Sequence, residues 1–405
     1  MVSPFLDKKH GSERIIVEWL SHLSDEFEIH VYSQQVEDFD RTKFTWHRIP
    51  KLPGPHLLNF LWWVAANRLW RDWDQRFRRL RHNLVFSSGA NCLDADVICV
   101  HIIFAKYVRQ VRSEMNFARN LTWEWPRLLH RKLYYRISVF MEDRAYKNRA
   151  TALVVNSRKT VGELKQFFGR ADHIPVLHVG LDHDVFNTAT RAKLREPARS
   201  ALAIPQNQFV LILVGNDWRN KGVPVLLNAL AGLRDRPIRL LIVTGEDLSA
   251  CRRLVTKKAL DDRVFFLPPR KDIEFYYAAA DAYVGPSLQD SYGIPPAEAM
   301  ACGLPVIVSS AAGVSEIVTN GVDGMILDDP KDATKLATMI QRLYEAQEFR
   351  DRLGVKAAET ARQYTWERNG RDLSAIFEEI VRRKAQADMQ TLTQESVESK
   401  LRKGR

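Results

Sequence analysis

The sequence contains few cysteines, and none of them is placed for a disulfide framework or a cysteine-based metal site. The four cysteines among 405 residues include no Cys-x-x-Cys pair, and each lies in an apolar or helical context. Such cysteines are typical of small buried side chains in a reduced compartment. We therefore expect all four to be buried: Cys92, Cys99, Cys251 and Cys302.

Long hydrophobic runs and secretion signals are also missing. No stretch of about 18 consecutive apolar residues occurs, so we predict no membrane-spanning helix, and the N-terminus lacks a secretory pattern. No helix-turn-helix, zinc-finger or RNA-binding signature is present, so nucleic acid is not an expected partner. No metal-ligand cluster is visible, and we expect no required metal or other cofactor. We expect a cytoplasmic protein. We also expect it to contact the inner face of the membrane peripherally.

The sequence does contain an excess of positive charge, which is concentrated in one window. The net charge is +11, with a pI near 9.5. Residues 51–150 hold 18 Lys and Arg against 8 Asp and Glu, together with six of the ten tryptophans. A basic chain favours anionic partners such as nucleotides or acidic lipids.

Strand and helix patterns alternate along the whole chain. The predicted strands at 152–157 and 209–215 contain continuous apolar runs, as expected for strands that are buried on both faces of a parallel sheet. Because 405 residues are too many for one hydrophobic core, we predict two α/β domains. The predicted divisions are an N-terminal domain over 1–180, a C-terminal domain over 181–362, a terminal helix over 363–385 and a polar, disordered tail over 386–405.

The beginning of the chain has the pattern of the end of a strand. Met1-Val2-Ser3-Pro4-Phe5 is followed by a polar loop, a helical pattern from Arg14 and an alternating segment over residues 27–32. In doubly wound folds the first strand is usually central. We therefore expect a central first strand that is truncated at its front half.

The densest group of functional residue types lies between residues 286 and 305. This segment follows a predicted strand, so it lies at the carboxyl edge of a sheet, where open α/β folds bind ligands. Gly293 permits close backbone approach, and the helix predicted from Pro295 offers N–H groups and a positive dipole end to a phosphate. We place Glu298 in the first turn of this helix, where its carboxylate suits a ribose diol. Asp290 precedes the helix and faces sugar hydroxyls. The alternative is that Glu298 only caps its helix and Asp290 is solvated.

This segment resembles the signature of the retaining glycosyltransferases of family 4, the glycosyl transferases group 1. The family usually has Glu-Gly-Phe-Gly-Leu-Pro-Pro-x-Glu-Ala-Met-Ala-Cys-Gly. The sequence here reads Asp290-Ser291-Tyr292-Gly293-Ile294-Pro295-Pro296-Ala297-Glu298-Ala299-Met300-Ala301-Cys302-Gly303. Asp290 is one methylene shorter than the usual Glu, so its contacts with the donor sugar differ or run through water. The resemblance implies the GT-B fold, with two Rossmann-like, doubly wound domains that face each other across a cleft.

The same resemblance covers most of the chain and assigns further residues to the donor site. Residues 214–222 are similar to the family's phosphate loop ending in Lys-Gly, so Lys221 is expected to bind the pyrophosphate, with Arg219 beside it. Two cations next to a diphosphate would stabilise both the bound donor and the leaving nucleotide. Asn216 stands where the family usually has Arg. Without the resemblance, this segment would be interpreted as a solvated basic loop. The resemblance also assigns Gly293 and Ile294 to donor binding.

The N-terminal half matches the family less closely. His10-Gly11-Ser12-Glu13-Arg14 resembles the family's Gly-Gly-x-Glu-Arg loop, with His10 at the first glycine and Gly11 close to the donor. A positive φ at the first position would strain His10. His101 ends a predicted strand that faces the expected cleft, where family members often place a functional side chain. The alternative for His101 is a structural role.

Residues 57–81 combine aromatic and basic side chains. Tryptophans beside arginines suit a membrane interface, where rings lie at headgroup level and guanidinium groups meet anionic lipid. The alternative is an ordinary helix that buries its aromatic side chains. We interpret the region as a contact surface for an anionic membrane, which would fit a lipid-linked acceptor. Its tryptophans and main arginines are Trp62, Trp63, Arg68, Trp70, Arg71, Trp73, Arg76, Arg78, Arg79 and Arg81.

We therefore predict an enzyme that transfers a sugar, with retention of configuration, from a UDP- or GDP-sugar to a glycan or lipid-linked acceptor. The predicted catalytic residues are Asp290, His101, Lys221 and Arg219. Two alternatives stay open. A nucleotide-sugar epimerase or hydrolase of the same fold would consume donor without acceptor. A non-catalytic member would bind nucleotide without turnover, an alternative that the substitutions at His10, Asn216 and Asp290 keep open.

Overall fold

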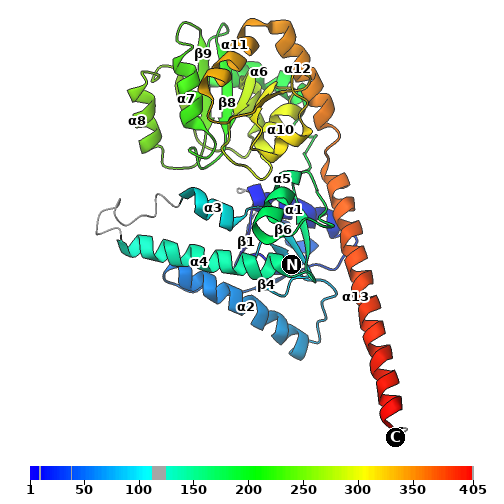
Figure 1. Cartoon of the computed structure of the whole chain (residues 1–405). Coiled ribbons are helices and arrows are strands. Elements are labelled where there is room, and N and C mark those ends of the chain that lie inside the picture. Colours follow the sequence, from blue (N-terminus) through cyan, green and yellow to red (C-terminus); the bar gives the residue numbers. More distant parts are fainter. Residues whose placement is uncertain (9–10, 38, 112–124, 404–405) are drawn as a thin grey trace. The chain divides into compact units, whose positions relative to one another are not determined.

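The computed structural model describes residues 1–8, 11–37, 39–111 and 125–403 (Figure 1). The chain divides into two compact units. The N-terminal unit consists of Met1–Leu177 together with Glu367–Arg405, and the C-terminal unit consists of His178–Trp366. Each unit is described by itself.

The C-terminal unit is built on one six-stranded sheet in which all strand pairs are parallel. The strand order β10-β9-β8-β11-β12-β13 corresponds to the doubly wound order 3-2-1-4-5-6. β8 reads Phe-Val-Leu-Ile-Leu-Val and is almost wholly buried, as a strand covered on both faces requires. The strands are β8 (Phe209–Val214), β9 (Ile238–Val243), β10 (Val264–Leu267), β11 (Ala282–Gly285), β12 (Val306–Ser309) and β13 (Met325–Leu327).

Helices of the C-terminal unit bury apolar stripes against this sheet. Leu226 and Leu230 of α7 join Leu336 and Ile340 of α11 in one core with β8, and all four are fully buried. Asparagine or aspartate side chains cap α6 and α11, which defines where these helices begin. The helices are α6 (Thr188–Ala201), α7 (Val223–Ala231), α8 (Ser249–Lys257), α9 (Glu274–Ala279), α10 (Ile294–Ala301), η5 (Gly313–Ile317), α11 (Ala333–Glu345) and α12 (Gln347–Ala361).

The N-terminal unit repeats the same strand order around the first three residues. Val2 forms parallel bridges to Tyr32 on one side and to Ser87 on the other, and its side chain is fully buried. Val2 thereby joins β2 and β4 to β5, β6 and β7, which gives the order 3-2-1-4-5-6 with residues 1–3 in the central place. The strands are β1 (Phe5–Leu6), β2 (His30–Ser33), β3 (Gln35–Val36), β4 (Thr45–Arg48), β5 (Phe86–Ser88), β6 (Val97–Val100) and β7 (Ala152–Val155).

Both units therefore confirm the predicted α/β class with two Rossmann-like domains. The helices of the N-terminal unit are α1 (Gly11–Leu23), η1 (Arg41–Lys43), α2 (His56–Phe77), α3 (Phe104–Gln110), α4 (Trp125–Lys147), α5 (Arg158–Phe168) and α13 (Trp366–Lys403). All four cysteines are buried, as expected. No helix within the described ranges has the length and apolar character needed to cross a bilayer.

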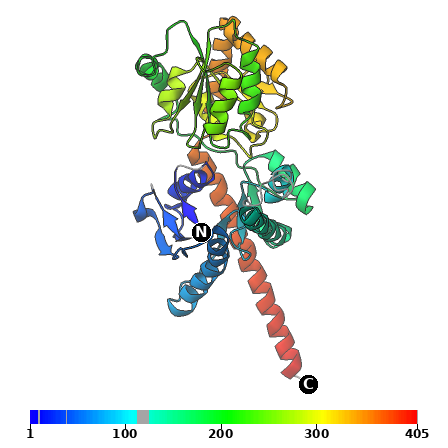
Figure 2. The same ribbon diagram turned by 90° about the vertical axis from the view of Figure 1, so that its left-hand side faces the viewer.

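The last helix, α13, is one continuous rod (red in Figures 1 and 2). Phe377 packs against Phe27 and Phe86, with ring centroids 6.0 and 5.3 Å away, so this helix belongs to the N-terminal unit. Residues 386–405 were expected to be disordered, but α13 continues to Lys403. The stretch has no proline, and its residues are mostly good helix formers, so a polar composition did not prevent a helix.

Candidate functional site

Two loops at the carboxyl edge of the C-terminal sheet hold most of the predicted site residues. One loop, residues 215–222, follows β8, and the other, residues 286–293, follows β11. β8 and β11 are neighbours, but the chain leaves them in opposite directions, towards β9 and β12. Open α/β sheets bind ligands at this switch point, so the two loops occupy the expected place for a site.

The two loops are packed and hydrogen-bonded to each other. Asn220 accepts from the Leu288 N–H at 2.7 Å and donates through Nδ2 to the Gln289 carbonyl at 2.8 Å. Gly222 has φ +78°, and a Cβ there would lie 2.0 Å from the Pro286 carbonyl oxygen. A glycine is therefore required at this position for both its conformation and its close packing.

Lys221 and Asp290 meet between these loops. The Lys221 Nζ lies 2.5 Å from Asp290 Oδ2, and both side chains are about four-fifths buried. Gly215 makes room for this contact, because a Cβ there would lie 2.9 Å from the Lys221 Cε. The structure thus brings together two of the four residues predicted to be catalytic. A partly buried ammonium next to a carboxylate is a charge-assisted pair that a competing anion can contact.

Gly293 and Ile294 form the start of α10. Gly293 is the N-cap residue, with φ +94°, and a Cβ there would lie 3.4 Å from Asp290 Oδ2. Pro295 and Pro296 have no N–H, so the backbone donors at this end are Gly293 and Ile294. These two N–H groups, the helix dipole and Lys221 all favour an anion at the same end of α10.

Glu298 lies deeper in the site than predicted. Its expected position in the first turn is wrong, because α10 begins at Ile294 and Glu298 is the fifth residue. The side chain is only 3% exposed, and its Oε2 accepts a hydrogen bond of 2.8 Å from the Tyr277 hydroxyl. Burial next to Glu298 raises the pKa of Tyr277, so the phenol stays a donor. Tyr277 is a site residue that the sequence analysis missed, since nothing in its Tyr-Ala-Ala context indicated a partner.

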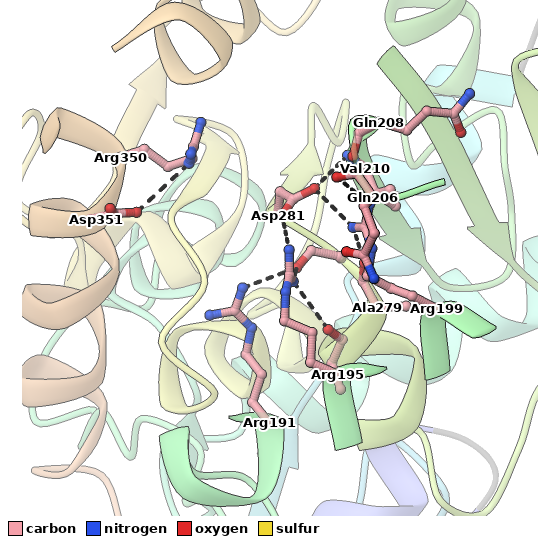
Figure 3. Close-up of polar contacts among 12 residues, drawn as sticks. Arg191, Arg195, Arg199, Gln206, Gln208, Val210, Ala279, Asp281, Arg350 and Asp351 are labelled. Atoms are coloured by element: carbon pink, nitrogen blue, oxygen red, sulfur yellow. Dashed lines mark hydrogen bonds and ion pairs between the residues drawn. The ribbon is translucent and has the colours of Figure 1, made fainter. Parts of the chain in front are cut away.

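Three arginines of α6 hold the helix from which Tyr277 projects (Figure 3). Arg191, Arg195 and Arg199 recur every fourth residue, and each donates to a backbone carbonyl among residues 278–280. Asp281 accepts from Arg195 at 2.5 Å and from Arg199 at 3.4 Å, and its Oδ2 also accepts from the Val210 N–H. The end of α9 is therefore fixed to α6 and β8, which fixes the base of Tyr277.

Arg219 does not join the Lys221 and Asp290 pair. Its guanidinium carbon lies 4.4 Å from the ring centroid of Trp218, a cation–π arrangement on an exposed part of the loop. Asn216, which replaces the family's usual arginine, ties the loop to the end of β9 by accepting from Thr244 Oγ1 at 3.2 Å and from the Gly245 N–H at 3.1 Å. The loop conformation thus depends on an amide where the family has a cation.

His101 lies in the N-terminal unit, directly after β6. Asn156 Nδ2 donates to the Leu177 carbonyl, so Asn156 Oδ1 faces His101 Nδ1 at 3.2 Å. Nδ1 therefore bears the proton. Nε2 is a buried acceptor that has no hydrogen-bond partner among the described residues. Burial lowers the pKa of His101 to about 4, so the ring is neutral at physiological pH.

The segment after His101 is held by a buried carboxylate of α4. Glu142 accepts from the Phe104 N–H at 2.7 Å and from the Ala105 N–H at 3.0 Å, where α3 begins. Burial raises the pKa of Glu142 to about 7. In the same unit, Gly11 is the exposed first residue of α1, whereas His10 lies outside the described residues.

Comparison with known proteins identifies the C-terminal segment. Residues 195–360 match the family model of the glycosyl transferases group 1, which confirms the resemblance for that part of the chain. The matched segment contains both loops, Lys221, Asp290 and Glu298.

Curated relatives match somewhat more than half of the chain. A D-inositol 3-phosphate glycosyltransferase of Corynebacterium kroppenstedtii is 31% identical over 251 residues, which are 58% of this chain and 55% of that protein. A protein of the same name from Arthrobacter sp. FB24 is 32% identical over 229 residues, or 54% of this chain and 53% of that protein. The chain therefore matches these relatives over about half of their length.

Solved structures match nearly the whole chain at low identity. WaaG, a glycosyltransferase involved in lipopolysaccharide biosynthesis, aligns with a TM-score of 0.74 at 20% identity over 93% of this chain and 98% of that chain. Anabaena Alr3699/HepE in complex with UDP-glucose aligns with a TM-score of 0.68 at 20% identity over 93% and 98%. These likenesses confirm the GT-B fold class.

Proposed function

We propose that the chain is a retaining glycosyltransferase that uses a UDP- or GDP-sugar as donor. The observation on which the proposal depends is the Lys221–Asp290 pair beside the N-terminus of α10, at the switch point of a unit that matches the glycosyl transferases group 1. Lysine, two backbone N–H groups and a helix dipole at one place suit the diphosphate of such a donor.

The proposed mechanism relies on stabilising the leaving diphosphate. Lys221 and the N–H groups of Gly293 and Ile294 would face the charge that develops as the bond between the sugar and the phosphate breaks. Glu298, held by Tyr277, would accept hydrogen bonds from the ribose hydroxyls. Asp290 would orient a sugar hydroxyl while it pairs with Lys221, and no step requires a metal ion.

Two residues of the N-terminal unit are proposed to contact the substrates. The Nε2 of His101 is a buried acceptor, which suits a hydroxyl of the transferred sugar or of the acceptor. Gly11, at the start of α1, follows the first strand of its sheet, so it lies at the switch point of the N-terminal unit. We propose that its backbone approaches the donor.

The proposed acceptor is a glycan or a lipid-linked glycan, reached from a membrane surface. Residues 57–81 supply exposed side chains such as Trp73 and Arg78 that suit an anionic bilayer, whereas Trp63 and Arg71 of the same region are buried. The enzyme would then be cytoplasmic and peripheral at the inner face of the membrane. The curated relatives are named for D-inositol 3-phosphate, so a phosphorylated cyclitol is a second acceptor class to test.

The test is calorimetric titration of the full chain with UDP and with GDP, without added metal. We expect one nucleotide to bind, and Lys221→Ala to weaken binding by at least roughly tenfold, as loss of a charge-assisted contact implies. Lys331→Ala, which removes an exposed lysine of the same unit, is the control and should bind normally. Binding of neither nucleotide by the wild-type chain would overturn the donor assignment.

Turnover separates the proposed transferase from its alternatives. With the nucleotide-sugar of the base that binds, loss of donor should require an acceptor, and the product should keep the anomeric configuration of the donor. Donor consumption without acceptor would favour an epimerase or hydrolase. Nucleotide binding without turnover on glycan, lipid-linked and cyclitol phosphate acceptors would favour a non-catalytic member.

A further inference from the structure

A cavity in the N-terminal unit lies between β4 and the second half of α2. Its volume is about 570 Å³, within the range of small-molecule sites. It belongs to a different unit from Lys221 and Asp290, and none of the predicted catalytic residues lines it. Its main lining side chains are Trp46, Arg48, Leu69, Trp70, Trp73 and Arg78.

The floor of the cavity is a rigid polar network around Asp74. Asp74 Oδ2 accepts from the Tyr32 hydroxyl at 2.8 Å and lies 2.7 Å from His47 Nδ1. Burial lowers the pKa of His47, so its neutral ring donates through Nδ1. The Tyr32 and His47 rings are stacked, with centroids 4.4 Å apart. Because Tyr32 and His47 already hold the Asp74 carboxylate in place, the floor of the cavity is formed before any ligand binds.

Two guanidinium groups lie at the rim of this cavity. Arg78, whose side chain is 66% exposed, directs Nε towards Asp74 Oδ1 at 3.4 Å. Arg48 lies over the Trp46 ring, with its guanidinium carbon 5.8 Å from the ring centroid, and the guanidinium carbon of Arg41 lies 5.0 Å from the same centroid. Guanidinium groups that are held in position favour a phosphate or another planar oxyanion.

The mouth of the cavity continues into an exposed apolar stripe on α2. Leu69 and Trp73 both line the cavity and are 58% exposed. The exposed side chains recur at intervals of three, four or eight residues, which places them along one side of the helix. Exposed leucine and phenylalanine side chains would not contribute to binding a soluble anion, but they suit the boundary between the headgroups and acyl chains of a bilayer. The stripe consists of Leu58, Leu61, Leu69, Trp73 and Phe77.

We propose that this cavity binds the anionic headgroup of a membrane lipid, while the α2 stripe enters the interface around it. The proposal rests on the membrane contact suggested for residues 57–81, but it is independent of the donor site. A specific headgroup site differs from diffuse attraction between a basic surface and a charged bilayer. In a specific site, the binding energy would depend on Arg48 and Arg78 more than on other exposed arginines of the same region.

The test compares two arginine variants of equal charge in vesicle co-sedimentation. The full chain is mixed with vesicles of phosphatidylcholine alone and with added phosphatidylglycerol. Arg48→Gln removes a cavity residue, whereas Arg68→Gln removes an exposed α2 arginine that is not among the lining residues and only loosely faces Asp72 at 3.8 Å. We expect Arg68→Gln to weaken binding by at most about fivefold, the effect of one surface cation, and Arg48→Gln by roughly twentyfold or more. Melting temperatures check that both variants fold.

Three outcomes would overturn the proposal. Equal losses for Arg48→Gln and Arg68→Gln would indicate diffuse charge. Binding of a soluble acidic oligosaccharide or glycerol phosphate as tight as binding to vesicles would assign the cavity to a soluble anion. Failure of the wild-type chain to bind either vesicle would overturn the membrane contact itself. Titration of the same sample with UDP and GDP would show separately whether the donor site stands.

A Trp73→Ala variant should also bind vesicles more weakly than the wild-type chain. This difference should persist at high salt, because the contribution of Trp73 is apolar and salt does not screen it.

Discussion

The two units share one strand order but differ in how many large hydrophobic side chains they expose. In the C-terminal unit the site side chains are paired, Lys221 with Asp290 and Tyr277 with Glu298. Among the described residues, only Val322 and Val355 of this unit are exposed large hydrophobics, whereas all the others identified lie in the N-terminal unit. Buried polar atoms without a hydrogen-bond partner among the described residues occur in both units, for example His101 Nε2 in the N-terminal unit and the Tyr292 hydroxyl in the C-terminal unit.

Similarity to known proteins follows the same division. The family model matches residues 195–360, within the C-terminal unit, whereas the likeness that covers nearly the whole chain is one of fold at 20% identity. The proposed donor-site residues Lys221, Asp290 and Glu298 lie within the matched segment, whereas the proposed membrane contact lies outside it. The following predictions test this contrast.

The largest expected effect is on packing at the switch point. Gly222→Ala should reduce the free energy of unfolding by more than about 3 kcal/mol, because Ala is disfavoured at φ +78° and its Cβ would collide with the Pro286 carbonyl. Gly89→Ala is the matched change after β5, with φ +70° but no atom within 4 Å of the new Cβ. It should cost only about 1–2 kcal/mol. Chemical denaturation measures both, and equal costs would mean that the loops of the C-terminal unit are not tightly packed.

Next is the role of Glu298. Glu298→Ala should weaken nucleotide affinity by roughly a hundredfold, because a carboxylate that accepts two hydrogen bonds is lost. Tyr277→Phe is the control, since it removes the hydroxyl that donates to Glu298 Oε2 but keeps the carboxylate. It should cost about 1 kcal/mol of stability and change affinity by less than about threefold. If Glu298→Ala reduced melting temperature and binding in equal measure, Glu298 would be a structural residue.

In the N-terminal unit we expect a pH effect from His101. Its folded pKa of about 4 lies below the usual value near 6.5, so between these values the unfolded chain binds a proton that the folded chain does not. The contribution of His101 to stability should therefore fall as pH falls from 6.5, by on the order of 2 kcal/mol at pH 5. His101→Gln should remove this component, while the contribution of His82, whose pKa burial also lowers, is the same in both proteins. Identical pH slopes in denaturation would contradict the buried neutral ring.

The smallest effect is expected for Arg219. Because its guanidinium stacks on Trp218, Arg219→Ala should weaken nucleotide binding by less than about fivefold, compared with the larger loss expected for Lys221→Ala. Titration of both variants under one condition gives the comparison. Equal losses would show that Arg219 turns towards the diphosphate when the donor binds, as the resemblance implies.

Part of this structure could be predicted from the sequence because it depends on local patterns. Continuous apolar strands predicted the parallel sheets, and the segment 286–305 was placed correctly at a carboxyl edge. The rest depends on contacts between distant residues. The Tyr277–Glu298 hydrogen bond joins residues 21 apart, and Arg199 and Arg191 of α6 reach carbonyls 80 and 89 residues away. The assignment of Glu298 to the first turn failed because Gly293 allowed α10 to begin before its prolines.

The hydrogen bonds of Asn220 make the loops after β8 and β11 a single cooperative element. In terms of amide exchange, the Leu288 N–H cannot open to solvent until Asn220 releases it, so one opening reaction exposes both loops. A ligand that contacts only Lys221 would therefore slow amide exchange in the loop of residues 286–293 as well, although it does not touch that loop. The site would respond to its nucleotide as one protected segment whose two halves are 69 residues apart in the sequence.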